Sequence, residues 1–242
     1  MVISHDYIFA VAGGEMKDGG VNLKQLIGTS FSIGNNFFIT ANHVITAALS
    51  YEVKGLLCFN EQNQAGLFPV EDDNYESFPD YDIAILKVDK IPHKFFPWDF
   101  SGLRMLENVM SSGFPFAFDP NQKKIITRCF KGYIVSAHPF YEFVSNPDSY
   151  ELSFSCPRGI SGAPLLTYEE PQKVVGIIIG NKSTEMNVYT EKEIISEEKE
   201  VVVERYESIQ YGLAIETASI KHVESKLLGT TIEDYINKIS ND

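Results

Sequence analysis

Cysteine is scarce in this sequence, and the few residues present have neither the spacing of a metal site nor that of a disulfide framework. The 242 residues include only three cysteines, Cys58, Cys129 and Cys156, with no C-x-x-C pair. An odd and sparse set argues against a secreted domain stapled by disulfides and favours a reducing compartment. No cluster of His, Cys and carboxylate residues has zinc-site spacing, so we expect no metal.

Long apolar runs and a surplus of positive charge are also missing. The apolar segments are short and interrupted, so we expect no transmembrane helix, and the first residues lack the basic and apolar regions of a signal peptide. A formal net charge of −13 argues against nucleic-acid binding, because phosphate contacts need Lys and Arg. Neither a Walker loop nor a dinucleotide fingerprint is present, so we expect no cofactor. These absences predict a cytoplasmic protein without nucleic-acid or membrane partners.

What the sequence does contain is a series of short apolar stretches separated by turn residues, which is typical of an all-β protein. A connector rich in proline and aromatic residues at 91–98 predicts a boundary between a first domain, 1–98, and a second, 99–242. Residues 181–207 hold eight acidic and four basic residues and are predicted to form a charged hairpin insertion. Residues 217–226 and 231–239 are predicted to form one or two helices, with Thr231 capping the last one.

A serine flanked by glycines is the strongest chemical signal. Ser161 lies in the stretch Gly159-Ile160-Ser161-Gly162, with His43 and Asp82 upstream in apolar frames. A serine hydroxyl needs a base within hydrogen-bond reach, and an imidazole held by a carboxylate supplies one. Asp80 is a competing candidate for the carboxylate, but it lacks the apolar run that follows Asp82.

These frames and four further motifs resemble those of the trypsin-like serine proteases, most closely the bacterial HtrA/Deg-like branch without a PDZ domain. The further motifs are residues 28–34, 112–115, 131–136 and 211–215, in the family's order. The resemblance implies two six-stranded antiparallel β-barrels of the chymotrypsin type and a C-terminal helix. It further implies a serine endopeptidase that cleaves protein or peptide substrates through an acyl-enzyme, with His43 and Asp82 in the first barrel and Ser161 in the second.

The same resemblance implies the remaining site residues. The backbone N–H groups of Gly159 and Ser161 would form the oxyanion hole. The substrate pocket would be formed by Ser155, Ile177, Ile179, Gly180 and Gly212. No acidic residue lies at its base, so no strong preference for Lys or Arg is expected. Ile160 replaces the aspartate that chymotrypsin-like zymogens carry before the serine, so activation by a cut N-terminus is not expected.

Two hypotheses compete with a constitutively active protease. In one, the chain is a protease-fold module that binds a protein partner with little turnover. In the other, it is a latent protease that a regulatory partner opens through the insertion at 181–207. The intact set of His43, Asp82 and Ser161 favours the active enzyme, whereas the uncharged Ile160 and the insertion keep both alternatives open.

Overall fold

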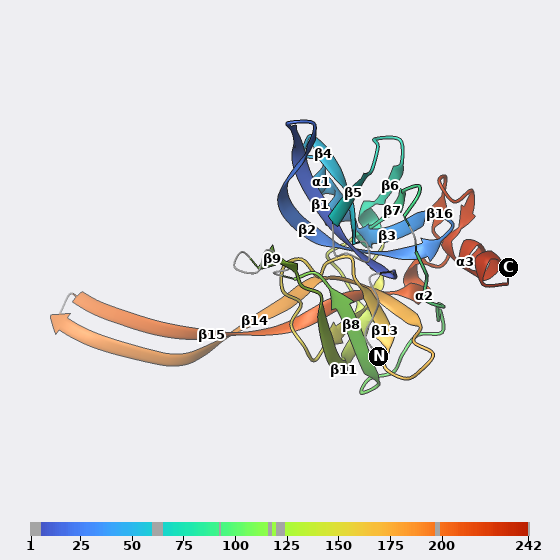
Figure 1. Cartoon of the computed structure of the whole chain (residues 1–242). Helices are drawn as coiled ribbons and strands as arrows, with labels where there is room; N and C mark the ends of the chain where they lie inside the picture. Colours follow the sequence, from blue (N-terminus) through green and yellow to red (C-terminus); the bar gives the residue numbers. More distant parts are fainter. Residues whose placement is uncertain are drawn as a thin grey trace.

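Two antiparallel β-sheets, stacked one above the other, form the body of the molecule (Figure 1). The computed structural model describes residues 6–59, 65–91, 93–115, 118–119, 124–196 and 199–241. Residues 1–5 of the predicted first domain, Glu197 and Glu198 of the predicted insertion, and Asp242 lie outside the described residues. The all-β, two-barrel fold class is confirmed.

The first sheet holds seven strands in the order β5-β4-β1-β2-β3-β7-β6, one more than predicted. The strands are β1 (Ile8–Lys17), β2 (Gly20–Gly34), β3 (Phe37–Ala41), β4 (Val53–Phe59), β5 (Ala65–Pro69), β6 (Tyr75–Phe78) and β7 (Ile83–Lys87). Helix α1 (Asn42–Ala48) follows β3, and the 3-10 turn η1 (Pro79–Tyr81) precedes β7.

Both faces of the central strands β3 and β7 of the first sheet are buried, which explains their continuous apolar runs. Along β7, Ile83 and Ile85 pack into one hydrophobic cluster, whereas Ala84 and Leu86 pack into another that includes α1. Successive side chains of a strand point to opposite faces, so a strand between two cores has no polar alternation. The apolar run at 83–86, which follows Asp82 but not Asp80, is therefore typical of a strand buried on both faces.

The second sheet is a closed barrel of six strands in the order β11-β12-β15-β14-β13-β8. Its strands are β8 (Asn108–Gly113), β11 (Arg128–Pro139), β12 (Asp148–Leu152), β13 (Pro164–Thr167), β14 (Val174–Ser196) and β15 (Lys199–Glu216). A separate two-stranded sheet is formed by β9 (Phe118–Asp119) and β10 (Lys124–Ile125).

One hydrophobic cluster joins the two sheets. It contains Phe31 and Ile39 of the first sheet together with Leu166, Ile177 and Ile215 of the barrel, all fully buried. The two halves of the chain therefore fold against a shared core. Side chains from both halves can meet next to this core.

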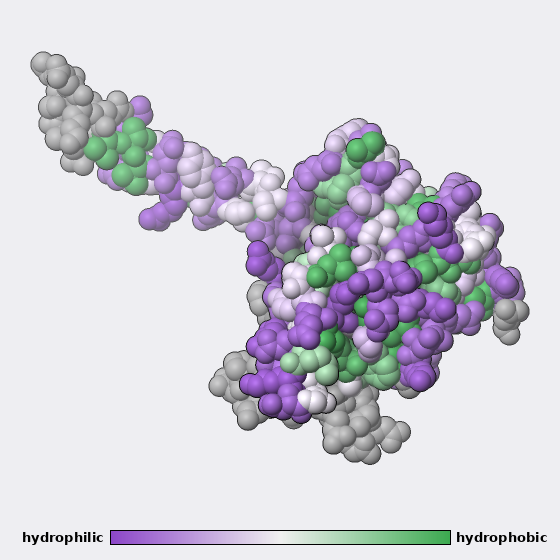
Figure 2. All heavy atoms as spheres, turned by 90° about the horizontal axis from the view of Figure 1, so that it is seen from above, coloured by the Kyte–Doolittle hydropathy of each residue, from purple (hydrophilic) through white to green (hydrophobic). Residues whose placement is uncertain are grey.

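A long two-stranded arm leaves the barrel. Strands β14 and β15 remain paired from Gly176↔Glu216 to Ser196↔Lys199, and Figures 1 and 2 show the paired strands extending as a narrow rod away from the body. We call residues 181–210 the arm; the described side chains at 181–192 and 201–210 are exposed. The predicted hairpin is present, and its strands continue those of the barrel without interruption.

The C-terminal segment returns to the first sheet. It comprises α2 (Thr217–Ile220), β16 (Glu224–Ser225), β17 (Thr230–Thr231) and α3 (Ile232–Asn241). The predicted helix at 217–226 is therefore wrong beyond residue 220, because residues 224–225 pair with β17. Thr231 Oγ1 accepts the Asp234 N–H at 3.2 Å, which is the predicted N-cap. The Tyr235 hydroxyl donates to the Gly34 carbonyl at 2.9 Å, so α3 is anchored on β2. No helix in the described part of the chain is long and apolar enough to cross a membrane.

Candidate active site

The side chains of His43 and Asp82 form a hydrogen-bonded pair at the edge of the first sheet. His43 lies in the first turn of α1, and Asp82 follows η1 in a left-handed conformation, with φ of 49°. His43 Nδ1 lies 2.7 Å from Asp82 Oδ2, and the His43 backbone N–H donates to Asp82 Oδ1 at 2.9 Å. A carboxylate only accepts, so the proton of a neutral imidazole resides on Nδ1 and leaves Nε2 as the acceptor.

The competing carboxylate, Asp80, is not the partner of His43. It lies within η1, and its backbone carbonyl accepts the Ser145 hydroxyl. Both carboxylate oxygens of Asp82 face His43, and the Asp82 carbonyl also accepts the Asn42 N–H at 2.9 Å. Three contacts therefore connect Asp82 to the start of α1.

Ser161 follows a tight turn at the edge of the barrel. The Ile160 N–H donates to the Pro157 carbonyl at 3.2 Å, and Gly159 has φ of +100°. A positive φ only at the third of the four turn residues is the pattern of a type II turn, which requires glycine there. A Cβ on Gly159 would lie 2.6 Å from the Phe114 carbonyl oxygen, so the space also excludes any other residue.

The turn is anchored on both sides of Ser161. Before the serine, the side chain of Ile160 is fully buried in a barrel cluster that includes Val109 and Leu165. After it, Gly162 has φ of +86° and donates its N–H to the Ile178 carbonyl at 2.7 Å. The serine is thus held by apolar burial and backbone hydrogen bonds.

One residue of the first sheet, Thr29, also contacts this turn. Its N–H donates to the Ser161 carbonyl at 2.8 Å, and its hydroxyl donates to the Gly159 carbonyl at 2.7 Å. The same hydroxyl accepts the Phe114 N–H at 3.1 Å. Sequence analysis gave Thr29 no role; its only signal was its place after Gly28 in a motif that resembles the family.

The two N–H groups predicted to form an oxyanion hole remain available. In the residues that the structure describes, neither the Gly159 N–H nor the Ser161 N–H donates a hydrogen bond. The Ser161 hydroxyl makes one long contact, 3.5 Å, to the Ile179 carbonyl.

His43 and Ser161 line the same open cavity of about 750 Å³, although they come from different sheets. Its other lining residues are Lys24, Gln25, Leu26, Ile27, Ala47, Phe114, Arg158 and Gly159. The cavity therefore brings together His43, Ser161 and Gly159, and Asp82 stands directly behind His43.

The predicted substrate pocket has a different character from this cavity. Ser155 is exposed and bonds the Gln210 carbonyl at 3.3 Å, whereas the side chains of Ile177 and Ile179 are buried in the core shared by the sheets. Gly180 of β14 pairs with Leu213 of the neighbouring strand β15. Gly212 donates its N–H to the Phe154 carbonyl at 2.8 Å. If Ile177 and Ile179 form a wall of the pocket, it is therefore their backbone atoms, not their side chains, that would face the substrate.

Asn181 lies beside the predicted substrate pocket, and the sequence analysis assigned it no role in the site. Its side-chain oxygen accepts the Cys156 N–H at 2.6 Å, and its amide donates to the Cys156 carbonyl at 2.7 Å. It thereby joins the root of the arm to the segment that leads to Ser161. Burial raises the pKa of the Cys156 thiol to about 12, against a smaller opposite effect of the Leu213 N–H, so this cysteine is no thiolate nucleophile.

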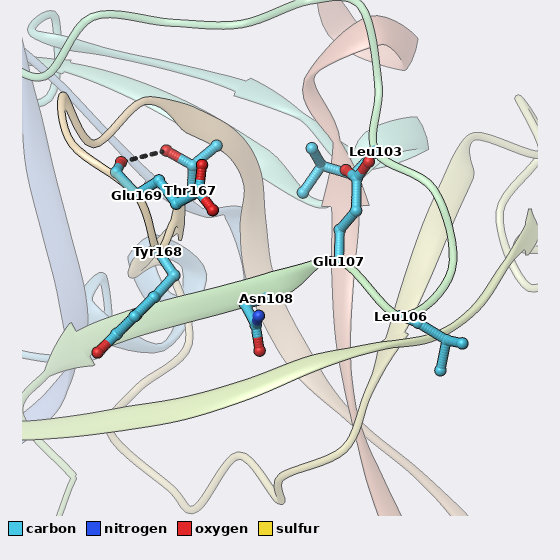
Figure 3. A pocket seen from close by; sticks show the side chains of 7 residues that line it. All are labelled: Leu103, Leu106, Glu107, Asn108, Thr167, Tyr168 and Glu169. Atoms are coloured by element: carbon cyan, nitrogen blue, oxygen red, sulfur yellow. Dashed lines mark hydrogen bonds between the residues drawn. The ribbon is translucent and has the colours of Figure 1, made fainter.

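A second cavity, of about 440 Å³, lies elsewhere on the barrel and holds none of the predicted catalytic residues. Figure 3 shows Tyr168 and Leu106 pointing in different directions at its two sides, with Glu107 between them. The Tyr168 ring is covered by Lys131, 3.7 Å from the centroid. Among the described residues no group of three or more His, Cys, Asp or Glu side chains is placed to hold a metal ion.

The comparisons with known proteins identify the family of the chain and solved structures of similar fold. The family model described as the trypsin-like peptidase domain matches residues 28–177. The active form of the Rv3671c protease from M. tuberculosis has a TM-score of 0.58 at 15% identity, covering 89% of this chain and 78% of that one.

Two further solved structures are similar at the level of the fold. The MamO protease domain from Magnetospirillum magneticum has a TM-score of 0.56 at 15% identity, covering 87% of this chain and 92% of that one. The HtrA-type protease AlgW with a decapeptide has a TM-score of 0.58 at 14% identity, covering 88% and 62%. No curated protein sequence is significantly similar to this chain. The family model spans more than half of the chain, and the chain belongs to the trypsin-like peptidases, a family of serine peptidases.

Proposed function

We propose that this protein is an endopeptidase in which Ser161, His43 and Asp82 act as a catalytic triad. The observation that carries the proposal is the Asp82–His43 pair, 2.7 Å apart, behind a cavity that Ser161 also lines. Serine catalysis needs a nucleophile, a base and a group that orients the base, and these three residues supply them.

The reaction would follow the acyl-enzyme route. Ser161 Oγ attacks the scissile carbonyl carbon while His43 Nε2 takes its proton, and Asp82 stabilises the resulting imidazolium. The C–N bond then breaks, and the leaving amine takes the proton from His43. A water molecule hydrolyses the ester by the same proton transfers in reverse and restores Ser161.

The Gly159 and Ser161 N–H groups are the proposed donors to the oxyanion. Donors that are already oriented in the resting enzyme need no reorganisation as charge develops, and each contributes about 2.7–4 kcal/mol to the transition state. The type II turn supports this role, because its positive φ at Gly159 and the buried Ile160 fix the peptide plane before substrate arrives.

The test is covalent labelling of the full chain with a fluorophosphonate probe, read by intact mass and peptide mapping. We expect a single adduct on Ser161 that is lost in Ser161→Ala and in His43→Ala. Arg104→Gln, an exposed change on the barrel, is the matched control and should label like the parent protein. A folded protein without an adduct, or an adduct on another residue, would refute the proposal.

A second candidate function rests on the arm. Asn181 at its root holds both backbone groups of Cys156, and Lys182 forms an ion pair with Glu151 of the barrel at 2.6 Å. A protein partner bound to the arm would thus act on the strand pair next to the predicted substrate pocket, as expected of a latent protease or a partner-binding module. A variant with residues 183–210 replaced by a short turn should then change its labelling rate, and an unchanged rate would exclude the regulatory role.

The location and partners remain part of the proposal. A cytoplasmic protein that acts on protein or peptide substrates, without membrane or nucleic-acid partners, fits the acidic composition and the sparse cysteines. Fractionation of cells that express a tagged full chain tests the location directly.

A further inference from the structure

The cavity beside Ser161 has a charge opposite to that of the protein. The chain carries a formal net charge of −13, yet the cavity is lined by two cationic side chains, Lys24 and Arg158, and by no carboxylate. A cleft lined by one sign of charge raises the local concentration of ligands of the other sign. The lining therefore favours an anionic group next to the proposed nucleophile.

Arg158 is the cation that remains uncompensated. It is exposed, and in the described part of the chain it makes neither a hydrogen bond nor an ion pair. It occupies the second position of the type II turn, one residue before Gly159. A guanidinium presents a planar fork of N–H donors that matches a carboxylate.

Lys24, in contrast, is already paired. Its ammonium lies 2.8 Å from Glu15 Oε1, which also accepts a hydrogen bond from Asn22 at 3.0 Å. These two hydrogen bonds, the one from Lys24 first, lower the pKa of Glu15. Because Glu15 neutralises Lys24, Arg158 is the main positive charge that can attract a carboxylate to the cavity.

The remaining lining of the cavity is formed by an irregular stretch of β2. Val11 of β1 pairs with Gly28, and Ala12 pairs with Leu26, so Ile27 is an extra residue in β2. A bulge of this kind breaks the strict alternation of side chains, and both Leu26 and Ile27 consequently line the cavity. Next to them, Gln25 is held by the Tyr51 hydroxyl. An extended peptide would meet an apolar wall here, in the cavity that Arg158 also lines.

The position of the cavity determines which part of a substrate it would hold. None of the residues predicted for the substrate pocket, such as Ser155 and Gly212, lines it. A peptide that crosses Ser161 with its acyl side at Ser155 and Gly212 would place its leaving-group side between β2 and Arg158.

We propose that Arg158 makes the enzyme prefer substrates with an aspartate or glutamate at the first or second residue after the scissile bond. This inference rests on the proposed peptidase function and specifies its substrate class. Arg158 would contact the substrate carboxylate directly and determine specificity, with no part in the bond-breaking steps.

The test is cleavage of a diverse synthetic peptide library by the full chain, with cleavage sites identified by mass spectrometry. We expect acidic residues to be enriched about three- to fivefold at those two positions, the upper part of what an exposed ion pair supplies. The enrichment should disappear in Arg158→Gln, persist in part in Arg158→Lys, and give way to basic residues in Arg158→Glu. Arg104→Gln, which removes one positive charge elsewhere on the barrel, should retain it.

A binding experiment separates this inference from the proposed function. In the inactive Ser161→Ala chain, labelled pentapeptide pools that begin Glu-Glu or Gln-Gln mimic the leaving-group product. The acidic pool should bind about three- to fivefold more tightly, and the difference should shrink between about 20 mM and about 300 mM salt. Equal affinities, or a difference that survives Arg158→Gln, would overturn the inference even if Ser161 is labelled. An unreactive Ser161 would instead overturn the peptidase proposal and with it the substrate preference, while the binding difference would still show whether Arg158 attracts carboxylates.

Discussion

The side chain of Ile160 holds the serine turn in place, and its truncation to alanine should inactivate the enzyme before it unfolds the protein. Ile160 is fully buried in the barrel cluster. Replacement by alanine removes three carbons, worth about 0.8 kcal/mol each. The cavity left behind brings the expected loss to about 3 kcal/mol, within the usual range of 2–5 for such changes. A domain of this size should then unfold roughly 6–12 °C lower.

The same loss acts locally on the turn. About 3 kcal/mol corresponds to a factor of roughly 150 in the equilibrium between the anchored and the released turn. Release would misplace the Gly159 and Ser161 N–H groups, so we expect the rate of fluorophosphonate labelling to fall at least tenfold while the protein remains folded.

The matched control is Leu165→Ala, which truncates another fully buried residue of the same cluster, on β13 and outside the turn. Thermal unfolding should show similar losses of stability for both variants, but only Ile160→Ala should lose labelling rate. Equal labelling rates in the two variants, whether both high or both low, would refute the idea that burial of Ile160 holds the proposed oxyanion donors.

Three further changes test other parts of the structure. Asp82→Asn should lower peptidase activity by about 10⁴, because the amide keeps the contact to the His43 backbone but favours the wrong imidazole tautomer; kcat/KM over a pH series measures this, and a loss below tenfold would contradict the assigned role. Gly162→Ala should yield little folded protein, since its Cβ would lie 2.1 Å from the Thr29 carbonyl oxygen at a positive φ; a normal circular-dichroism melt would contradict this. His138 donates from Nδ1 to the Pro139 carbonyl at 2.8 Å and from Nε2 to Glu151 at 2.9 Å, which requires the imidazolium, and these hydrogen bonds raise its pKa. Stability from this pair is present below about pH 6.5 and is lost as pH rises through the higher folded-state pKa, so His138→Gln should destabilise more at pH 6 than at pH 9 in denaturant titrations, and equal effects would refute the assignment.

Local sequence patterns predict much of this fold, because strands, turns and helix ends are specified by residues that are close together in the sequence. The apolar run after Asp82 indicates a strand buried on both faces, and the structure places alternate residues of β7 in two clusters. The glycines around Ser161 predict a tight turn, and Gly159 and Gly162 both have positive φ. Thr231 predicts the start of α3, and its hydroxyl accepts the expected N–H.

Contacts between distant segments could not be predicted in this way. Nothing near Tyr235 in the sequence indicates that its hydroxyl meets the Gly34 carbonyl, 201 residues away. Asn181 has no motif that marks it as a partner of Cys156. The sequence does not show how far the strands of the arm extend, because two strands that pair only with each other need no apolar face and so carry no burial pattern.

The position of Ser161 depends on both halves of the chain. Thr29, fully buried in the first sheet, contacts the serine turn through its N–H and its hydroxyl, and its carbonyl accepts the Thr40 hydroxyl at 2.6 Å. These contacts join the strand that precedes His43 to the turn that precedes Ser161. Thr29 and Thr40 are fully buried, so the loss of a partner of either residue leaves an unpaired buried polar group, which costs about 1–3 kcal/mol. The turn that carries the proposed nucleophile is therefore held by residues of both halves of the chain, and neither half can form the site alone.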